Sequence, residues 1–169
     1  MDNVNLDPVV GEEVRWGYQP GVFRIVRVRY PGDEHPNPNL RTPLTGFCTA
    51  DLQRAGNNFI HEGVPWGVLQ YIDETRPIRR FLEWLKQDES FRYPQGITGF
   101  RVDSEERFDG EPQFVVRFLV ESTAQPTRET VREWNDFTSW VREQILTLNL
   151  DRWVQVMVQK EQETMHATL

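Results

Sequence analysis

The residues of this chain best suited to binding chemistry are its arginines. Of the 19 basic residues, 17 are Arg, and the other two are Lys86 and Lys160. A guanidinium presents a planar, bidentate set of donors that matches a carboxylate or a phosphate, whereas an ammonium is a mobile point charge. Codon bias is the simpler explanation of the excess. The positions of the arginines therefore carry more information than their number.

Three arginines fall in the first turn of a helix expected over residues 76–88. The helix dipole and the free amides at that end favour anions and disfavour cations. Arg76, Arg79 and Arg80 are therefore a candidate site for a phosphate or for a partner's carboxylates. The alternative is local neutralisation by the neighbouring acids Asp73, Glu74 and Glu83.

A second candidate is the outer face of a β-sheet. The expected strand pairing sets Arg101 directly across from Arg117, which is unfavourable unless an anion or an acid lies between them. Three further arginines would add to this surface if an N-terminal hairpin joins the sheet edge: Arg24, Arg27 and Arg29. The alternative is ordinary surface pairing of these arginines with Asp103, Glu105 and the acidic helices, which contributes ~0 to 1 kcal/mol for each pair.

Nucleophilic and metal chemistry have weak signals. Cys48 is the only thiol, and it would need His61 or His35 beside it to form a Cys-His pair. A free Cys is more often a buried packing residue, and no flanking motif supports activation. The three histidines, which include His166, are far apart and form no metal-binding pair on a helix. We therefore expect a non-enzymatic protein with no cofactor and no metal.

The elements that would position these residues repeat along the chain. Residues 66–102 and 113–158 each contain a β-prone segment, a helix with Phe-x-x-Trp (Phe81–Lys86 and Phe137–Arg142) and a second β-prone segment. Two such units in series favour an α+β, ferredoxin-like (split β-α-β) antiparallel sheet with two helices on one face. The expected strands are near 66–72, 97–106, 112–121 and 152–159, and the expected helices are 76–88 and 127–148.

The hairpin between the two units is specific enough to predict its register. A three-residue loop, Phe108-Asp109-Gly110, with Gly110 in the left-handed conformation, pairs Val102 with Val116 and Phe100 with Phe118. It also sets Arg107 opposite Glu111. A two-residue Asp-Gly turn would instead place charged residues against the apolar face.

The N-terminal half is less regular. We expect a mobile tail over 1–12 and a β-hairpin of 13–17 with 22–30, with one inserted residue near Ile25 and Val26. A long Pro-rich loop over 31–44 follows, and Ala50–Ala55 is interpreted as one helical turn. These elements complete one α+β domain over 13–160, followed by a C-terminal tail over 161–169.

Composition limits the classes of partner. The net charge of −7 argues against nonspecific nucleic-acid binding. An RNA-stacking platform is also missing, because the open sheet face is expected to present Val115, Arg117 and Leu119 rather than aromatics. The absence of an apolar run long enough to span a membrane, together with a single Cys, is typical of a cytoplasmic protein. The six Trp are mostly expected in the core, and an exposed pair would indicate a homodimer.

The sequence thus predicts a binding or regulatory module that docks an acidic protein partner through Arg-lined surface. The alternative is nucleic-acid or phosphoryl-ligand binding through the same arginines. An enzyme with Cys48 as nucleophile is the third hypothesis.

Overall fold

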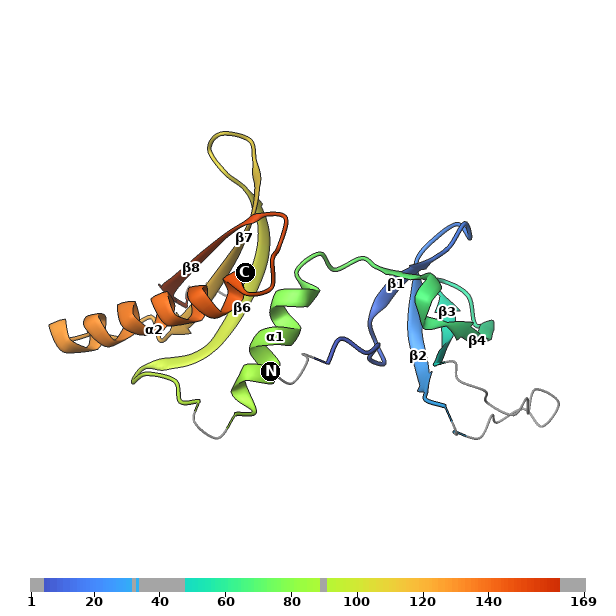
Figure 1. The fold of residues 1–169 in the computed structure, drawn as a ribbon, viewed down its shortest axis with the longest axis horizontal. Helices are drawn as coiled ribbons and strands as arrows, with labels where there is room; N and C mark the ends of the chain where they lie inside the picture. The colour runs from blue at the N-terminus through green and yellow to red at the C-terminus, as the bar shows by residue number, and fades with distance from the viewer. Residues whose placement is uncertain (1–4, 32, 34–47, 89–90, 162–169) are drawn as a thin grey trace, which may run out of the picture. The chain divides into compact units, whose positions relative to one another are not determined.

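The computed structural model describes residues 5–31, 33, 48–88 and 91–161 (Figure 1). The chain divides into two compact units. The N-terminal unit is the described part of residues 6–74, and the C-terminal unit is Asn5 with the described part of residues 75–169. The single domain expected over 13–160 is therefore divided near residue 75. No helix among the described residues is long and apolar enough to cross a membrane.

The N-terminal unit is a five-stranded antiparallel sheet with the strand order β4-β3-β2-β1-β5. A single 3-10 turn, η2 (Trp66–Val68), precedes the last strand, which returns to pair with the first. The strands are β1 (Glu13–Trp16), β2 (Phe23–Arg29), β3 (Thr49–Arg54), β4 (Ile60–Pro65) and β5 (Leu69–Tyr71).

Apolar residues from all five strands form one core. It contains Val14, Phe23, Ile25, Ala50, Leu52, Val64 and Leu69. The hairpin of β1 and β2 is confirmed, and so is the irregularity near Ile25, where the register of β2 against β3 shifts between Ile25 and Arg27. Arg27 and Arg29 follow this bulge on one face of β2, and Arg27 is exposed whereas Arg29 is buried.

The C-terminal unit is a three-stranded sheet, β6-β7-β8, with two helices packed on one face (Figure 1). The hairpin strands β6 and β7 are antiparallel, while β7 and β8 are parallel neighbours joined through α2. The elements are α1 (Arg76–Lys86), β6 (Ile97–Glu106), β7 (Pro112–Val120), α2 (Arg128–Leu146) and β8 (Trp153–Lys160).

The helices and strands of this unit follow the apolar pattern of the sequence. Ile78, Phe81, Leu82 and Leu85 of α1 join Trp134, Val141 and Ile145 of α2 above the even-numbered residues of β7. Thr127 begins α2 by accepting a hydrogen bond from the backbone N–H of Thr130 at 3.2 Å, which satisfies one of the free amides of the first turn.

The hairpin register is confirmed. Val102 pairs with Val116, Phe100 with Phe118 and Arg101 with Arg117. Gly110 has φ +85° in the loop, where a side chain would be strained. The N–H of Arg107 donates to the carbonyl of Glu111 at 2.8 Å, which closes the three-residue turn.

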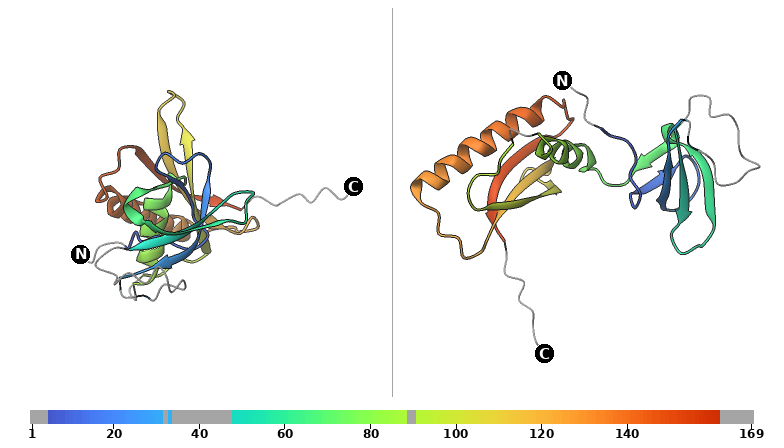
Figure 2. Two further views of the ribbon diagram at one scale, coloured as in Figure 1. Left: turned by 90° about the vertical axis from the view of Figure 1, so that its right-hand side faces the viewer. Right: turned by 90° about the horizontal axis from the view of Figure 1, so that it is seen from below.

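The ferredoxin-like topology is not what the structure shows. The segment expected as the first strand of that sheet contributes β5 to the other sheet, where Leu69 packs in the N-terminal core. In the expected topology that strand would lie between β7 and β8. Without it, β7 and β8 are parallel neighbours (Figure 2). The α+β class and the placement of two helices on one face are retained.

Two further expectations differ from the structure in the N-terminal unit. Residues 50–55 are not a helical turn, because residues 50–54 belong to β3. The expected mobile tail is hydrogen-bonded to β2 at its end, since Gly11 donates to the carbonyl of Ile25 and Ile25 donates to that of Glu12. The Pro-rich loop over 31–44 and the C-terminal tail lie almost entirely outside the described residues.

Candidate functional site

The arginines at the start of α1 all have partners within the chain. Arg76 is buried. The guanidinium of Arg79 lies 3.7 Å from the carboxylate of Glu83, one turn further along the helix. Arg80 donates two hydrogen bonds to the backbone carbonyl of Asn5, at 2.9 and 3.2 Å. These contacts match the alternative of local pairing better than an open anion site.

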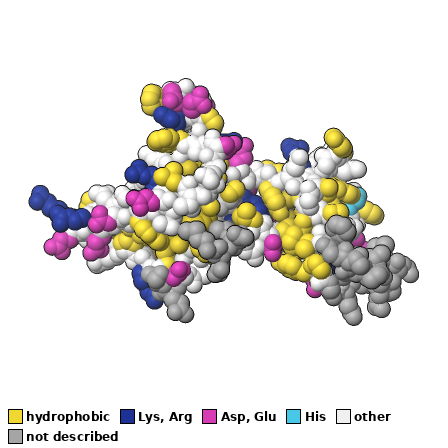
Figure 3. Space-filling view, in the orientation of Figure 1, with side chains coloured by type: hydrophobic (Ala, Val, Ile, Leu, Met, Phe, Trp, Pro, Cys, Tyr) yellow, Lys and Arg dark blue, Asp and Glu magenta, His cyan; other side chains and the backbone are white. Residues whose placement is uncertain are grey.

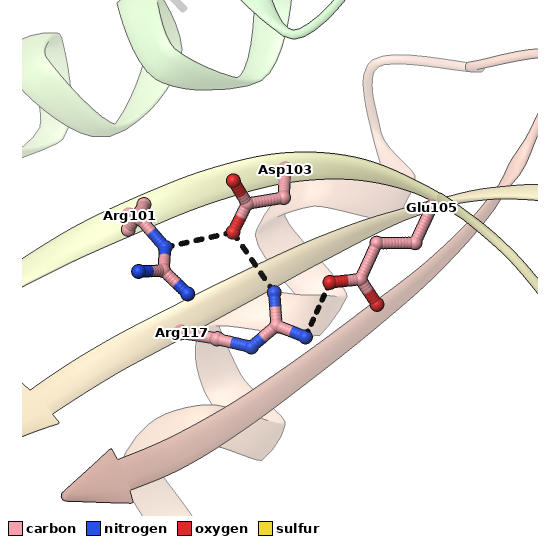
Figure 4. A network of polar contacts seen from close by, with 4 residues as sticks. All are labelled: Arg101, Asp103, Glu105 and Arg117. Carbon is pink, nitrogen blue, oxygen red and sulfur yellow. Dashed lines mark hydrogen bonds and ion pairs between the residues drawn. The ribbon is translucent and has the colours of Figure 1, made fainter. Parts of the chain in front are cut away.

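The arginines of the sheet face form a closed network with two acids (Figure 4). One oxygen of Asp103 accepts from Arg101 at 2.8 Å and from Arg117 at 2.9 Å. The other terminal nitrogen of Arg117 donates to Glu105 at 2.5 Å. The carboxylate of Asp103 thus lies between two cations that face each other across the strands, and it removes their repulsion. Two positive and two negative side chains leave this cluster without net charge.

Arg29 serves the interior of the N-terminal unit rather than its surface. Arg29 is 1% exposed, and its guanidinium pairs with Asp51, which is 4% exposed. The second oxygen of Asp51 accepts the N–H of Gly63 at 3.0 Å, so the pair ties β2 and β3 to β4. Nε and Nη1 of Arg29 have no hydrogen-bond partner among the described residues.

Arg24 is a predicted site residue that lines a cavity. It is exposed on β2 and lines a cleft of about 510 Å³ together with Arg54 and Glu13. Arg27 is also exposed, but it lies outside this cleft. The remaining lining residues come from the end of the β1–β2 hairpin and from the turn after β3: Val22, Phe23, Gln53, Ala55, Gly56, Asn57 and Asn58.

Arg54 is the residue that the sequence reasoning missed. Its guanidinium lies over the ring of Phe23, with 5.1 Å between Cζ and the ring centroid. Its Nε is buried and has no hydrogen-bond partner in the described part of the chain. A buried donor without a partner is uncommon in a folded protein, because it loses its hydrogen bonds to water without replacement. The signal in the sequence was a cation directly before the turn Ala-Gly-Asn-Asn.

The turn after β3 holds one wall of this cleft in place. The N–H of Ala55 donates to the carbonyl of Val22, and the N–H of Asn57 donates to the carbonyl of Arg54. The side chain of Gln53 donates to the carbonyl of Asn57 at 3.0 Å. Gly56 has φ +76°, which favours glycine at this position. Backbone hydrogen bonds and the side chain of Gln53 therefore hold this wall of the cleft.

The thiol and the imidazole considered for catalysis occupy separate environments. Cys48 is half-buried, and its backbone carbonyl accepts the N–H of Trp66. The ring of His61 lies among the rings of Trp16, Phe23 and Phe59, with centroid distances of 4.8 to 5.7 Å. His35 and His166 are outside the described residues. No group of three His, Cys, Asp or Glu side chains suited to a metal is found in the described ranges.

Burial perturbs one titratable group. Tyr93 lies beside the ring of Phe91, and its hydroxyl is buried with no hydrogen-bond partner among the described residues. Burial raises the pKa of this phenol above its ordinary value, because the charged form would lose its hydration. The group is part of the packing around the C-terminal core rather than of the cleft.

The face drawn in Figure 3 has basic and acidic side chains interspersed over it, without one continuous basic area. This distribution agrees with the ion pairs of Arg79, Arg101 and Arg117. A local site is therefore a better guide to binding than the overall number of arginines.

In the comparisons with known proteins, no family model, no curated protein and no solved structure matches this chain.

Proposed function

We propose that this protein is a binding module that docks an acidic segment of a protein partner, and that the cleft of Arg24 and Arg54 receives that segment. The observation that carries this proposal is a pair of arginines, Arg24 and Arg54, in the lining of one cleft of about 510 Å³. A carboxylate that enters the cleft would pair with these guanidinium groups. Charge-assisted pairs of this kind are short and strong, and the guanidinium can hold both carboxylate oxygens.

The charges of the cleft favour a peptide carboxylate over a polyanion. Arg24 and Arg54 contribute two positive charges, and Glu13 contributes one negative charge. A single Asp or Glu side chain on a neutral backbone would be attracted. A nucleic-acid strand would also bring its phosphates towards Glu13, within a chain of net charge −7. Binding of nucleic acid or a phosphoryl ligand by the same arginines remains the competing hypothesis.

The test compares Arg54→Gln with Arg27→Gln in the full chain. Arg27 is the matched control, because it is exposed on the same strand as Arg24 but lies outside the cleft. Binding of a fluorescent peptide rich in Asp and Glu is measured by anisotropy at two salt concentrations. Arg54→Gln should weaken binding by about tenfold or more, since charged hydrogen bonds contribute ~1.5–3 kcal/mol. Arg27→Gln should change it little.

Three outcomes would contradict the proposal. Equal binding by Arg54→Gln and Arg27→Gln would show that the cleft is not the site. Affinity that does not fall with added salt would exclude ion pairing as its source. Stronger competition by inorganic pyrophosphate or a single-stranded oligonucleotide than by the acidic peptide would favour the phosphoryl-ligand hypothesis.

A further inference from the structure

Among the described residues, no strand pairs with the outer edge of β8. In the three-stranded sheet β7 is central and β8 is at one side. An edge strand presents unpaired backbone groups, and proteins commonly protect such an edge with bulges, Pro, Gly or charges. The eight residues of β8 read WVQVMVQK, with no Pro or Gly and with charge only at Lys160. The pairing of β8 with β7 continues without a register shift from Trp153 to Lys160.

The backbone groups that face this open edge can be assigned. The N–H of Glu161 donates to the carbonyl of Val120 in β7. Along a strand the direction of the N–H and C=O groups alternates, so the odd-numbered residues of β8 bond to β7. The N–H and C=O groups of Val154, Val156 and Val158 therefore point away from β7. The side chains of these three residues pack on the helix side of the sheet.

We propose that a second copy of this chain occupies the edge, with its β8 antiparallel to the first and the twofold axis at Val156. In this register Val156 faces Val156 of the other copy, and Val154 faces Val158. All three pairs are of the hydrogen-bonded type, so six new backbone hydrogen bonds would form (two for each pair). Residues that face each other lie on the same side of the sheet, which gives a continuous row of valines beneath the helices. The edge is thus complementary to itself, as a twofold interface requires.

The exposed flank of α2 supports the same partner. On one flank, Phe137 and Trp140 contact Phe91, and Phe137 also contacts Phe118 of β7. The opposite flank, which faces beyond β8, carries Val131 and Leu146, which are 40% and 65% exposed.

A twofold axis perpendicular to the sheet makes the α2 helices of the two copies antiparallel. The flank of α2 that carries Val131 and Leu146 in one copy would then face the same flank of the other. The dimer would thus join two three-stranded sheets into one six-stranded sheet and cover apolar surface on both α2 helices.

The first test is the mass of the full chain by light scattering after size exclusion. The expected value is twice the chain mass of 20.0 kDa. Val156→Pro removes an N–H that faces the open edge and none that bonds to β7, so it should give a folded monomer. Leu146→Glu should weaken the dimer at least tenfold through the helix contact. Phe108→Glu is the matched control, because Phe108 is 98% exposed at the tip of the β6–β7 hairpin, and this variant should remain dimeric.

Disulfide trapping tests the register in a Cys48→Ser background. With the axis at Val156, residue 155 of one copy faces residue 157 of the other as a non-hydrogen-bonded pair, with Cα atoms ~4.5 Å apart. That distance is within the ~4.4–6.8 Å range of disulfides. A mixture of Gln155→Cys and Met157→Cys proteins should therefore form mixed disulfide dimers, and neither protein should do so alone.

A monomeric wild-type chain at its highest soluble concentration would overturn the proposal. Unchanged dimerisation of both Val156→Pro and Leu146→Glu would also overturn it. Disulfide formation by Met157→Cys alone, without mixed dimers, would refute the axis at Val156. If Val156→Pro fails to fold, Leu146→Glu and the trapping experiment still decide the question. None of these measurements depends on the cleft of Arg54.

Discussion

The buried pair of Arg29 and Asp51 allows a quantitative test of how the N-terminal unit is held together. Nη2 of Arg29 lies 2.5 Å from the carboxylate of Asp51, and the other carboxylate oxygen accepts the N–H of Gly63. Asp51→Ala would leave a guanidinium buried without its counter-ion. Removal of one partner from a buried pair costs ~3–5 kcal/mol. That is a large share of the ~5–15 kcal/mol that stabilises a typical domain.

Replacement of both partners should behave differently. Arg29→Met with Asp51→Leu removes two charges whose desolvation opposes folding, and it also removes the unpartnered Nε and Nη1 of Arg29. Exchange of a buried ion pair for apolar side chains is often neutral or stabilising by ~1–4 kcal/mol. The N–H of Gly63 also loses its acceptor, so we expect the double variant to be much more stable than Asp51→Ala and close to the wild type in stability.

The measurement must report on the N-terminal unit within the full chain. Hydrogen exchange followed by mass spectrometry gives the opening free energy of the amides in β2, β3 and β4, and urea unfolding gives the global transition. Asp51→Asn is the control, since the amide keeps an acceptor for Gly63 but loses the charge. A cost below about 1 kcal/mol for Asp51→Ala, or a double variant no more stable than that single variant, would refute this account of the pair.

Three further substitutions test the C-terminal unit. Tyr93→Phe should raise stability by up to about 1 kcal/mol, because it removes a buried hydroxyl without a partner. The pKa of Tyr93 is raised on folding, so the folded state favours the neutral phenol. The resulting contribution to folding stability is complete below pH ~10 and is lost as the pH rises through the folded pKa. Tyr93→Phe should therefore flatten the decline in melting temperature above pH ~10. Val116→Asp should abolish cooperative unfolding because it buries a charge, whereas Arg117→Ala should leave a folded unit. An equal loss of melting temperature in the two variants would contradict the register of β6 against β7. Thr127→Ala should cost ~1 kcal/mol through the lost N-cap bond to Thr130, and an unchanged urea midpoint would show that the cap contributes nothing.

The C-terminal unit could be predicted well from the sequence because its elements obey simple periods. The valines at 154, 156 and 158 alternate, and the stripe of α2 from Trp134 to Ile145 repeats every three or four residues. The hairpin register followed from a local choice between two turn lengths. That choice needed no knowledge of distant residues, since Gly110 and the pairing of Arg107 with Glu111 determine it.

The N-terminal unit could not be predicted in the same way because bulges disrupt its periods. In β3, Ala50, Asp51 and Leu52 are buried in succession, so no alternation is visible and a helical turn seemed plausible. The register of β3 against β4 shifts between Ala50 and Leu52. The assignment of β5 failed for another reason. Its β-prone residues were recognised, but the choice of a sheet partner depends on β1, which lies more than fifty residues earlier in the chain.

The arginines show the limit of sequence reasoning about binding. Six of the eight candidate arginines have partners within the chain: Arg29, Arg76, Arg79, Arg80, Arg101 and Arg117. For Arg29, Arg79, Arg80, Arg101 and Arg117 the partner is an acid or a backbone oxygen that the fold brings close. The sequence alone could identify only those within a few positions. Arg54 was overlooked because its surroundings come from β1, β2 and the turn after β3.

The distribution of charge in the fold gives the arginine excess a physical interpretation. Most guanidinium groups join strands or helices internally, as Arg117 does with Asp103 and Glu105, and such neutral clusters exert little long-range attraction. A chain of net charge −7 can then attract an acidic partner only at short range, where a few cations lack acids of their own. In the cleft of Arg24 and Arg54, two cations have one lining acid, Glu13, between them. Affinity at such a site should depend on the spacing of one or two carboxylates in the partner more than on its total charge.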